Sequence, residues 1–391
     1  MLLRTKGVLA KIKPLIKWTG GKYKEFAEFK QFIPHFDQYI EPFLGGGGVF
    51  FALQSGKRSF LNDKSKDLIS FYTNLNNAEF KHQSLLYADA WDKATLLNKD
   101  LLSLEKNLFS HYLSEKISST ELKDRLKDLF NGIDHSAYYP LFDAEFNLNP
   151  VSFINFLADS LAHKFKRIQR ITKRELRVFI NDELDAHFET GLKSGIYLYL
   201  RKLMNDDFSG KRKLSPAKAI ANWYFVREFC YASMFRYNVK GGFNIPYGGT
   251  AYNYKNYRSK VEQLFSAEVK KLFKNASFSN LDFEDFLKTL TLSSSDFIFL
   301  DPPYDSEFSE YDQNTFTQHD QRRLCACLEK ISAKWMMVIK ETPFIRSLYE
   351  KEGIYILDFK KNYTYNVRGR NDRNTQHLII LNYDPQKVRT T

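Results

Sequence analysis

The sequence predicts an α/β protein in which a large, mostly helical insertion interrupts one helix-covered sheet. Short apolar runs stopped by turn residues occur near both ends of the chain, as expected for strands buried on both faces. The middle instead spaces its apolar residues as helices do, among many polar and basic residues. The 391 residues exceed one small domain. We therefore expect the sheet domain at 1–67 and 274–391, with the insertion at 68–273.

The first part of the sheet domain is predicted from two short strands. Residues 36–42 are a short strand candidate that leads to four glycines, 45–48, and an apolar, helix-compatible pattern follows at 49–54. Residues 58–62 form the second strand, which ends at Asp63. A strand, a glycine turn and a helix in this order are typical of a nucleotide-binding α/β unit.

The second part supplies three more apolar runs, at 297–300, 335–339 and 378–381. The first of them is stopped by two prolines. In the insertion, residues 118–121 have the spacing of a helix capping box. The apolar residues that follow share one helical face: Leu122, Leu126, Leu129 and Phe130.

Composition restricts the class of protein further. Hydrophobic residues make up 43% of the chain, enough for a sizeable core, and the formal net charge of +12 favours a polyanionic partner. Charge alone does not identify nucleic acid, because many Lys-rich proteins bind none. Three cysteines argue against a disulfide framework and for a reducing cytoplasm. No apolar run approaches 18 residues, so we expect no membrane partner.

The glycine turn predicts a cofactor that contains a nucleoside. Glycine lets a backbone approach a ligand closely because no Cβ intervenes. In nucleotide-binding units of this kind, an acidic residue about 20 positions after the first glycine accepts the ribose hydroxyls. Asp63 stands close to that spacing from Gly45. A dinucleotide and S-adenosylmethionine both fit this pattern, and a glycine-rich loop without a ligand is the alternative.

Four consecutive residues after a buried strand form the predicted catalytic loop: Asp301, Pro302, Pro303 and Tyr304. The prolines remove two N–H donors, so a carboxylate and backbone carbonyls remain as acceptors. Acceptors that hold both N–H bonds of a ring-attached amine favour its attack on a sulfonium methyl group. Tyr304 suits stacking on a base flipped out of a duplex. The alternative is a strand-ending turn in which Asp301 caps a helix.

Three further segments have a functional and a purely structural interpretation. Residues 17–22 suit the methionine end of a cofactor, or a packed tryptophan beside a surface turn. Residues 236–249 suit a DNA-contacting hairpin or an ordinary one. Basic clusters at 164–177 and 211–213 suit phosphates or a solvated helix face. The residues predicted to contact DNA are Arg236, Asn238, Lys240, Asn244, Lys211 and Arg212.

Together these segments resemble the Dam-type DNA adenine methyltransferases, the D12 class. The motifs that carry the resemblance stand in order at 17–22 (KWTGGK), 41–47 (EPFLGGG), 61–63 (LND) and 301–304 (DPPY). The likeness covers about residues 14–72, 223–257 and 275–383, and it is weak at 73–222. The joint presence of the four motifs is highly specific.

The resemblance implies a class I S-adenosylmethionine-dependent methyltransferase, with a Rossmann-like sheet of seven strands and a target-recognition domain at 68–273. It implies methyl transfer to N6 of an adenine flipped out of duplex DNA, for restriction-modification or epigenetic marking. Asp301 would bridge the cofactor's amino group and the base amine. The cofactor-binding residues that it implies are Trp18, Lys22, Phe43, Gly45, Gly47, Asp63, Asp282, Phe283 and Asp301.

The stretch from Asp63 to Arg236 is much longer than in compact members of this family, so no recognition sequence is carried over. The nearest alternative is an RNA base amino-methyltransferase, which would not be expected to carry both residues 17–22 and the hairpin. We expect double-stranded DNA as partner, a separate cognate restriction endonuclease as a second one, and no metal. We further expect a monomer or weak dimer in the cytoplasm, encoded by a bacterium or phage.

Overall fold

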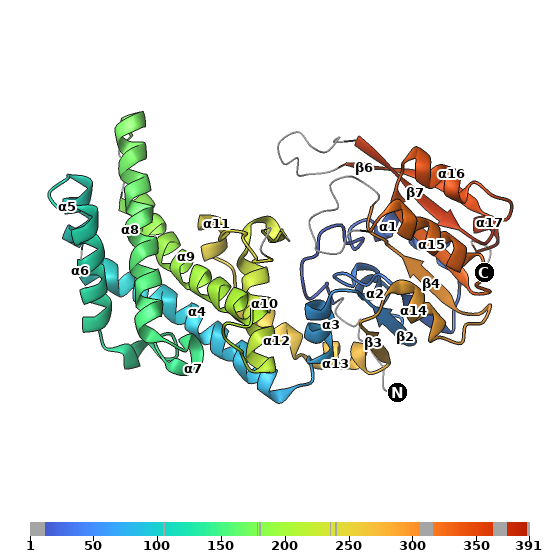
Figure 1. The fold of residues 1–391 in the computed structure, drawn as a ribbon, viewed down its shortest axis with the longest axis horizontal. Coiled ribbons are helices and arrows are strands. Elements are labelled where there is room, and N and C mark those ends of the chain that lie inside the picture. The colour runs from blue at the N-terminus through green and yellow to red at the C-terminus, as the bar shows by residue number, and fades with distance from the viewer. Residues whose placement is uncertain are drawn as a thin grey trace, which may run out of the picture. The chain divides into compact units, whose positions relative to one another are not determined.

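The computed structural model describes residues 12–104, 106–177, 179, 181–234, 236–238, 241–304, 316–362 and 374–388. The chain divides into two compact units (Figure 1): unit 1 is Met1–Thr73 with Ser266–Thr391, and unit 2 is Asn74–Phe265. Unit 2 is narrower at each end than the expected insertion, 68–273. The helices at its two borders, α3 (Lys66–Thr73) and α13 (Ala267–Phe273), belong to unit 1.

Unit 1 contains a seven-stranded sheet in the order β3-β2-β1-β4-β5-β7-β6. The neighbours from β3 to β5 are parallel, and β7 is antiparallel to both β5 and β6. The predicted α/β class with seven strands is confirmed. The strands are β1 (Gln38–Glu41), β2 (Arg58–Asn62), β3 (Ala276–Ser279), β4 (Phe297–Leu300), β5 (Lys334–Lys340), β6 (Tyr355–Asn362) and β7 (Asn374–Leu381).

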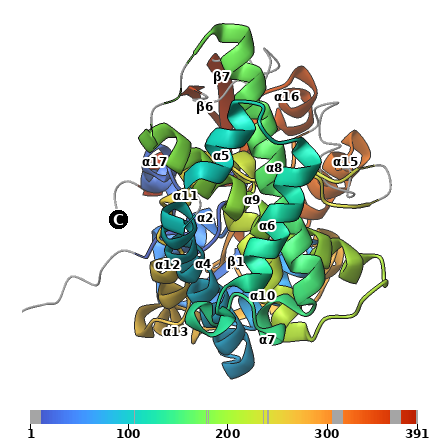
Figure 2. The ribbon, with the colours of Figure 1, turned by 90° about the vertical axis from the view of Figure 1, so that its left-hand side faces the viewer.

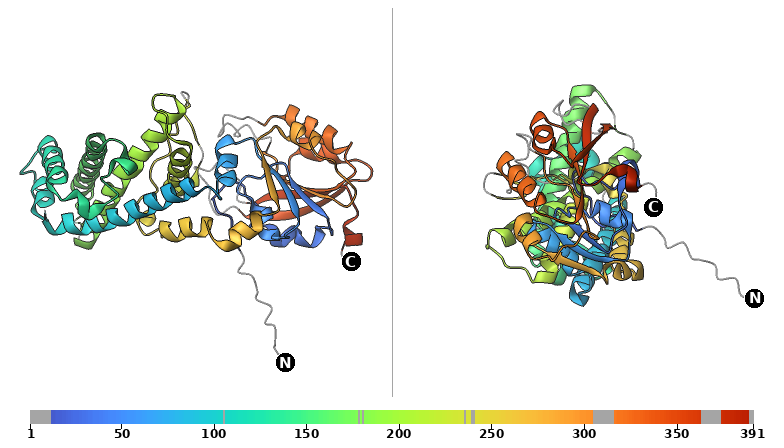
Figure 3. Two further views of the ribbon diagram at one scale, coloured as in Figure 1. Left: turned by 90° about the horizontal axis from the view of Figure 1, so that it is seen from below. Right: turned by 90° about the vertical axis from the view of Figure 1, so that its right-hand side faces the viewer.

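Strand β4 explains why a continuous apolar run is needed at the centre of this sheet. Side chains alternate between the two faces of a strand. Ile298 and Leu300 belong to a core that also contains residues of α14, α15 and α16. On β4 the intervening Phe297 and Phe299 meet other rings, and Phe299 stacks on Phe29 of α1 at 5.5 Å between ring centroids. Figure 3 shows the strands of unit 1 between helices from both ends of the chain.

The order of the strands places a topological switch between β1 and β4. From β1 the chain moves outward to β2 and β3, whereas β4 and β5 lie on the other side of β1. Ligands of open α/β sheets bind at the carboxyl ends of strands beside such a switch. The glycine turn follows β1 and the Asp-Pro-Pro-Tyr loop follows β4, so both lie at this position.

The helices of unit 1 are α1 (Phe26–Phe29), η1 (Lys30–Phe32), α2 (Gly48–Leu53), α3, α13, α14 (Phe283–Lys288), α15 (Gln318–Leu328), α16 (Pro343–Tyr349) and α17 (Pro385–Val388). Those at the sheet borders pack through aromatic rings. Tyr72 of α3 stacks on Phe278 of β3 at 5.5 Å, and Phe273 of α13 lies 5.3 Å from the same ring. These contacts explain why both helices belong to the sheet unit.

Unit 2 is helical, as predicted, and its long helices run beside one another (Figure 2). Ser118 accepts a hydrogen bond from the Glu121 N–H at the start of α6, which confirms the predicted helix start. Among the described residues, no helix has both the length and the apolar character needed to cross a membrane. The helices are α4 (Ala78–Leu104), α5 (Lys106–Leu113), α6 (Ser119–Gly132), η2 (His135–Tyr138), α7 (Ala144–Asn147), α8 (Pro150–Glu175), α9 (Asn181–Phe208), α10 (Pro216–Phe229), η3 (Tyr231–Ser233), α11 (Thr250–Asn253) and α12 (Tyr257–Leu264).

Candidate functional site

The glycine turn after β1 is packed directly against residues 18–23. Gly45 has φ of +50°, and a Cβ placed on it would lie 2.9 Å from Cδ1 of Trp18. A Cβ on Gly48 would lie 2.9 Å from the backbone nitrogen of Tyr23 and 3.0 Å from that of Lys22. Real Cβ atoms do not tolerate such a distance to backbone, so Gly48 requires glycine, and the positive φ of Gly45 favours glycine there. The predicted cofactor-binding residues Trp18 and Lys22 are thereby brought to the turn.

Asp63 at the end of β2 is tied to the same turn. Its Oδ2 accepts the Gly45 N–H at 2.8 Å, and its Oδ1 accepts the Ser65 N–H at 2.8 Å. A carboxylate is an acceptor that can take several hydrogen bonds at once, including those of hydroxyl groups. The predicted spacing of an acidic residue after the first glycine therefore corresponds to a direct contact in the folded chain.

Asn62, the last residue of β2, holds two loops together. Its buried side chain donates to the carbonyls of Pro42 and Leu281 at 3.0 Å each, and its Oδ1 accepts the Leu281 N–H. The loops after β1 and β3 are thereby fixed to the end of β2. Asn62 stands in one of the four motifs, but the sequence predicts no role for it; the available signal is an amide directly before the acidic residue.

Three aromatic rings form a group beside the turn. Phe43 lies 5.5 Å from Phe283 and 5.6 Å from Phe316, and the last two are 5.7 Å apart. Phe43 and Phe283 are predicted cofactor-binding residues, and the structure brings them together. Phe316 was missed because it follows the catalytic loop without any motif of its own.

Asp282 forms part of an ion-pair cluster next to these rings. Its Oδ1 accepts both the Glu284 N–H, which caps α14, and Nη2 of Arg323 at 2.8 Å. The Arg323 guanidinium also pairs with Glu284 and lies 4.9 Å from the Phe283 ring centroid. The hydrogen bonds that Arg323 donates to the carboxylates of Asp282 and Glu284 raise the pKa of its guanidinium. The cluster fixes the orientation of Phe283.

The catalytic loop after β4 contacts Lys22. The Lys22 side chain is only 1% exposed, and its ammonium forms an ion pair with Asp301. It also donates to the Gly20 carbonyl at 3.0 Å and to the Tyr304 hydroxyl at 3.3 Å. Lys22 therefore lies between the glycine turn and the predicted catalytic residues, and connects them.

Two residues missed by sequence analysis complete the loop. Gln321 of α15 donates to the Pro303 carbonyl at 2.9 Å. His377 of β7 is fully buried, and its Nε2 lies 3.2 Å from the Tyr304 hydroxyl. His377 could not be assigned from the sequence, because it stands in a strand far along the chain, between Gln376 and an apolar run.

Glu41, the last residue of β1, is a second buried acid near the site. It is 2% exposed, and Oε2 accepts the Tyr39 hydroxyl at 2.9 Å. Burial raises the pKa of Glu41 well above its usual value, against the opposing effect of the Tyr39 hydrogen bond, and the negative charges of Asp301 and Asp63 raise it further.

The predicted DNA-contacting hairpin lies in unit 2 and is held by its own polar groups. Arg236 is exposed and its Nε donates to Asn244 Oδ1 at 3.2 Å. Asn238 Oδ1 accepts the Gly242 N–H at 3.0 Å and closes the turn. Asn205 of α9 binds the backbone N–H and carbonyl of Phe243, at 2.8 and 3.0 Å. Lys240 lies outside the described residues.

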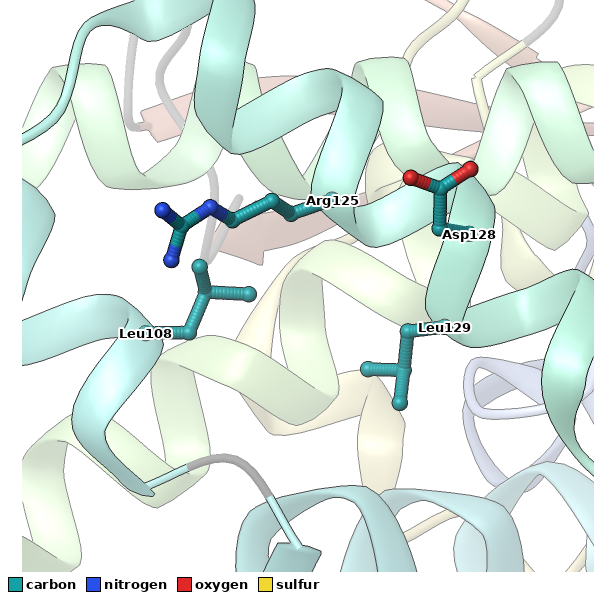
Figure 4. A pocket seen from close by; sticks show the side chains of 4 residues that line it. All are labelled: Leu108, Arg125, Asp128 and Leu129. Atoms are coloured by element: carbon teal, nitrogen blue, oxygen red, sulfur yellow. The ribbon is translucent and has the colours of Figure 1, made fainter.

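The predicted phosphate-contacting clusters are on the surface of unit 2. Lys211 and Arg212 are exposed in the loop between α9 and α10. On α8, Lys173 pairs with Glu115 and Arg174 with Glu175. An open hollow of about 310 Å³ in the same unit contains none of the predicted site residues (Figure 4); it is lined by Leu108, Arg125, Asp128 and Leu129.

Comparisons with known proteins agree with this geometry. A family model described as D12 class N6 adenine-specific DNA methyltransferase matches residues 18–139 and 154–363. The Type II methyltransferase M.CviBI of Paramecium bursaria Chlorella virus NC1A is 33% identical over 201 residues, which cover 49% of this chain and 74% of that protein. The alternative of an RNA base amino-methyltransferase is not supported by these comparisons.

Two more distant relatives match almost from end to end. The Type II methyltransferase M.MjaIII of Methanocaldococcus jannaschii is 24% identical over 95% of this chain and 99% of its own length. The DNA adenine methylase of Vibrio cholerae serotype O1 is 22% identical over 93% of this chain and 94% of its own. The helical insertion is therefore not peculiar to this chain, although motifs alone indicated only a weak resemblance at 73–222.

Proposed function

Because the chain belongs to the D12 class of N6 adenine-specific DNA methyltransferases, we propose that S-adenosylmethionine is its methyl donor and that its own active site is the cluster around Lys22. The observation that carries this proposal is the position of Lys22. It contacts the glycine turn through its backbone and the Asp301 carboxylate through its ammonium. The two sequence motifs expected to hold donor and acceptor are therefore parts of one site.

The residues at this site fit S-adenosylmethionine. Phe43, Phe283 and Phe316 offer apolar ring faces for an adenine, and Asp63 offers acceptors for ribose hydroxyls. The absence of a Cβ at Gly45 lets the Trp18 side chain lie against the turn, beside these rings and Asp63. When bound, S-adenosylmethionine supplies an electrophilic methyl group on a sulfonium sulfur.

Asp301 and the backbone of the catalytic loop hold the amine of the target base. The Pro303 carbonyl already accepts a hydrogen bond from Gln321. We therefore assign the two N–H bonds of the amine to the Asp301 carboxylate and the Pro302 carbonyl. These acceptors favour a pyramidal nitrogen whose lone pair is available for attack, and they stabilise the positive charge that develops on it. The excess proton then leaves the nitrogen for water.

Tyr304 supplies the stacking surface for a base outside the duplex. Its ring packs partly against the core of unit 1, and its hydroxyl is held at the Lys22 side. A duplex base cannot reach a buried amine-binding loop, so the adenine has to be flipped out. We assign the recognition of its sequence context to the hairpin at 236–249 and the basic surface of unit 2, with a separate endonuclease of the same specificity as the partner in restriction-modification.

Expression in a host without DNA methylation tests this function. Sequencing that detects modified bases should find N6-methyladenine at one short sequence throughout the genome. A purified sample should transfer labelled methyl groups from S-adenosylmethionine to the unmethylated genomic DNA of the same host. Methylated cytosine, or label on ribosomal RNA and none on DNA, would contradict the proposal. A D301A protein, prepared in parallel, controls for contaminating host enzymes.

A further inference from the structure

We infer that His377 is a positioning residue for the active-site tyrosine: it accepts the Tyr304 hydroxyl proton through Nε2 and so fixes the ring against which the target base stacks. This inference rests on the proposed function of the catalytic loop. It concerns a residue that belongs to none of the four motifs and that reaches the site from the far end of the chain, in the antiparallel strand β7.

The contact is within hydrogen-bond distance and partly buried. His377 is fully buried, and its Nε2 lies 3.2 Å from the Tyr304 hydroxyl oxygen. The two rings meet edge to face, with centroids 5.9 Å apart and planes at 74°. Within the sheet, His377 is paired with Lys340 of β5 on one side of β7 and with Phe359 of β6 on the other. Both neighbouring strands therefore restrict the backbone from which the imidazole extends.

The direction of the hydrogen bonds follows from the chemistry of Lys22. An ammonium can only donate, so the bond between Lys22 and Tyr304 uses a lone pair of the hydroxyl. The hydroxyl has one proton, and His377 Nε2 stands within reach of it. We assign the proton of the hydroxyl to the bond with His377, so that the hydrogen bonds run from Lys22 to Tyr304 to His377. This direction requires the neutral imidazole to carry its proton on Nδ1.

This chain of hydrogen bonds has a function that packing alone does not supply. Tyr304 follows two prolines at the end of a strand, and its ring is only partly buried. A hydroxyl held by Lys22 on one side and His377 on the other fixes the outer end of the ring, which limits its tilt and its movement away from the loop. Stacking of a flipped base depends on that orientation. The same lysine, Lys22, holds both Asp301 and Tyr304.

Four variants test the inference in single-turnover methylation of unmethylated genomic DNA with labelled S-adenosylmethionine. H377L removes the acceptor, H377Q retains one, Y304F removes the donor, and the fourth combines Y304F with H377L. We expect H377L to lower the rate constant about 10- to 100-fold, as a misplaced reacting group does. H377Q should recover most of the rate. I379V, on the same face of β7, controls for loosened packing and should methylate normally.

The decisive comparison is the double variant. If His377 acts through the Tyr304 hydroxyl, adding H377L to Y304F should change the rate by less than about twofold, whereas independent effects would multiply. A multiplied loss, or an H377L protein as fast as the wild type, would overturn the inference. If H377L does not fold, H377Q replaces it in the same cycle. Its loss of rate should be smaller and should again not multiply with that of Y304F.

A measurement without cofactor or DNA gives a second readout. NMR of the protein labelled with ¹⁵N-histidine, with the signal assigned by its disappearance in H377Q, reports which ring nitrogen carries the proton. We expect the Nδ1–H form in the wild type and a shifted Nε2 signal in Y304F. An Nε2–H form would overturn the inference even if the enzyme methylates DNA. A wild type that transfers no methyl group would instead contradict the proposed function.

Discussion

The active site of unit 1 and the hairpin of unit 2 are stabilised in different ways. In unit 1, Lys22 and Asp301 are far apart in the sequence, and their ion pair exists only when the sheet has assembled. In the hairpin, Arg236 bonds to Asn244 and Asn238 to Gly242, all within a few residues. The first site is built by the fold, whereas the second is closed by local turns and attached to α9 through Asn205, Tyr197 and Arg201.

Because one site depends on tertiary contacts and the other on local hydrogen bonds, substitutions in the two sites should have different consequences. Removing a group from a buried, mutually paired site changes both chemistry and stability, because the remaining partner stays out of water. Removing an exposed group from a locally closed hairpin should change recognition and leave the fold intact. The following predictions, from the largest expected effect to the smallest, test that distinction.

The largest effect should come from D301A. Loss of the acceptor for the base amine should lower the methylation rate by at least about 10²–10³-fold. The Lys22 ammonium, 1% exposed, would also remain buried without its carboxylate. Such a break costs about 3–5 kcal/mol of unfolding free energy. Rate and denaturant unfolding measured on the same preparation check both effects.

A second substitution separates these two effects. The double variant K22M/D301A removes both charges, so it should regain most of the unfolding free energy and none of the activity. DNA binding by either variant should stay sensitive to salt, because the basic surface of unit 2 is unchanged. A D301A protein that is as stable as the wild type would mean that the Lys22–Asp301 pair is not desolvated as the structure describes.

The next largest effect is expected at the glycine turn. G48A would bring a Cβ within 2.9 Å of backbone atoms, so we expect a loss of about 1–3 kcal/mol in unfolding free energy and weaker binding of S-adenosylmethionine. G132A at the end of α6 is the matched control, since nothing lies within 4 Å of the added Cβ. It should be neutral or gain up to about 1 kcal/mol. Equal behaviour of both variants would contradict the close packing.

R236A should have a smaller effect, confined to recognition. Its guanidinium is exposed and bonds only weakly within the hairpin, so melting temperature and cofactor affinity should not change. Preference for the recognition sequence should fall by about 1–3 kcal/mol, as for loss of one base-reading arginine. Sequencing of genomic DNA methylated by the variant would show it as modification of related sites. If the set of methylated sites is unchanged, Arg236 does not take part in sequence recognition.

The smallest effect concerns the pH dependence of stability. Because burial raises the pKa of Glu41, the folded chain keeps a proton that the unfolded chain loses. The folded state therefore binds more protons, and this contribution to stability, complete below the usual carboxyl pKa, is lost as pH rises through the raised value. E41Q cannot ionise, so its stability relative to wild type should increase from pH 5 to pH 8. A constant difference would show that Glu41 is ionised in the folded chain.

The sequence predicts the parts of the molecule in which a few residues determine both local conformation and chemistry. The segments predicted as strands at 58–62 and 297–300 correspond to β2 and β4 residue for residue. The second is continuously apolar, as expected for a strand buried on both faces. Strand β3, with the sequence ASFS, and β6, with mixed polar residues, lie at the two edges of the sheet and have no such pattern. Asn62 and His377 act through tertiary contacts, which spacing along the chain does not encode.

The position of β7 between β5 and β6 has a consequence for synthesis on the ribosome. Unit 2 is continuous in sequence and can bury its helical core once residue 265 has left the ribosome. Strand β5, in contrast, has no partner on one edge until β7 has been synthesised. At 5–20 residues per second, the apolar edge of β5 stays open for about 2–8 s, long enough for contact with other nascent chains. A translation product released before residue 377 would contain the motifs of the catalytic loop but could neither close the sheet nor restrain Tyr304.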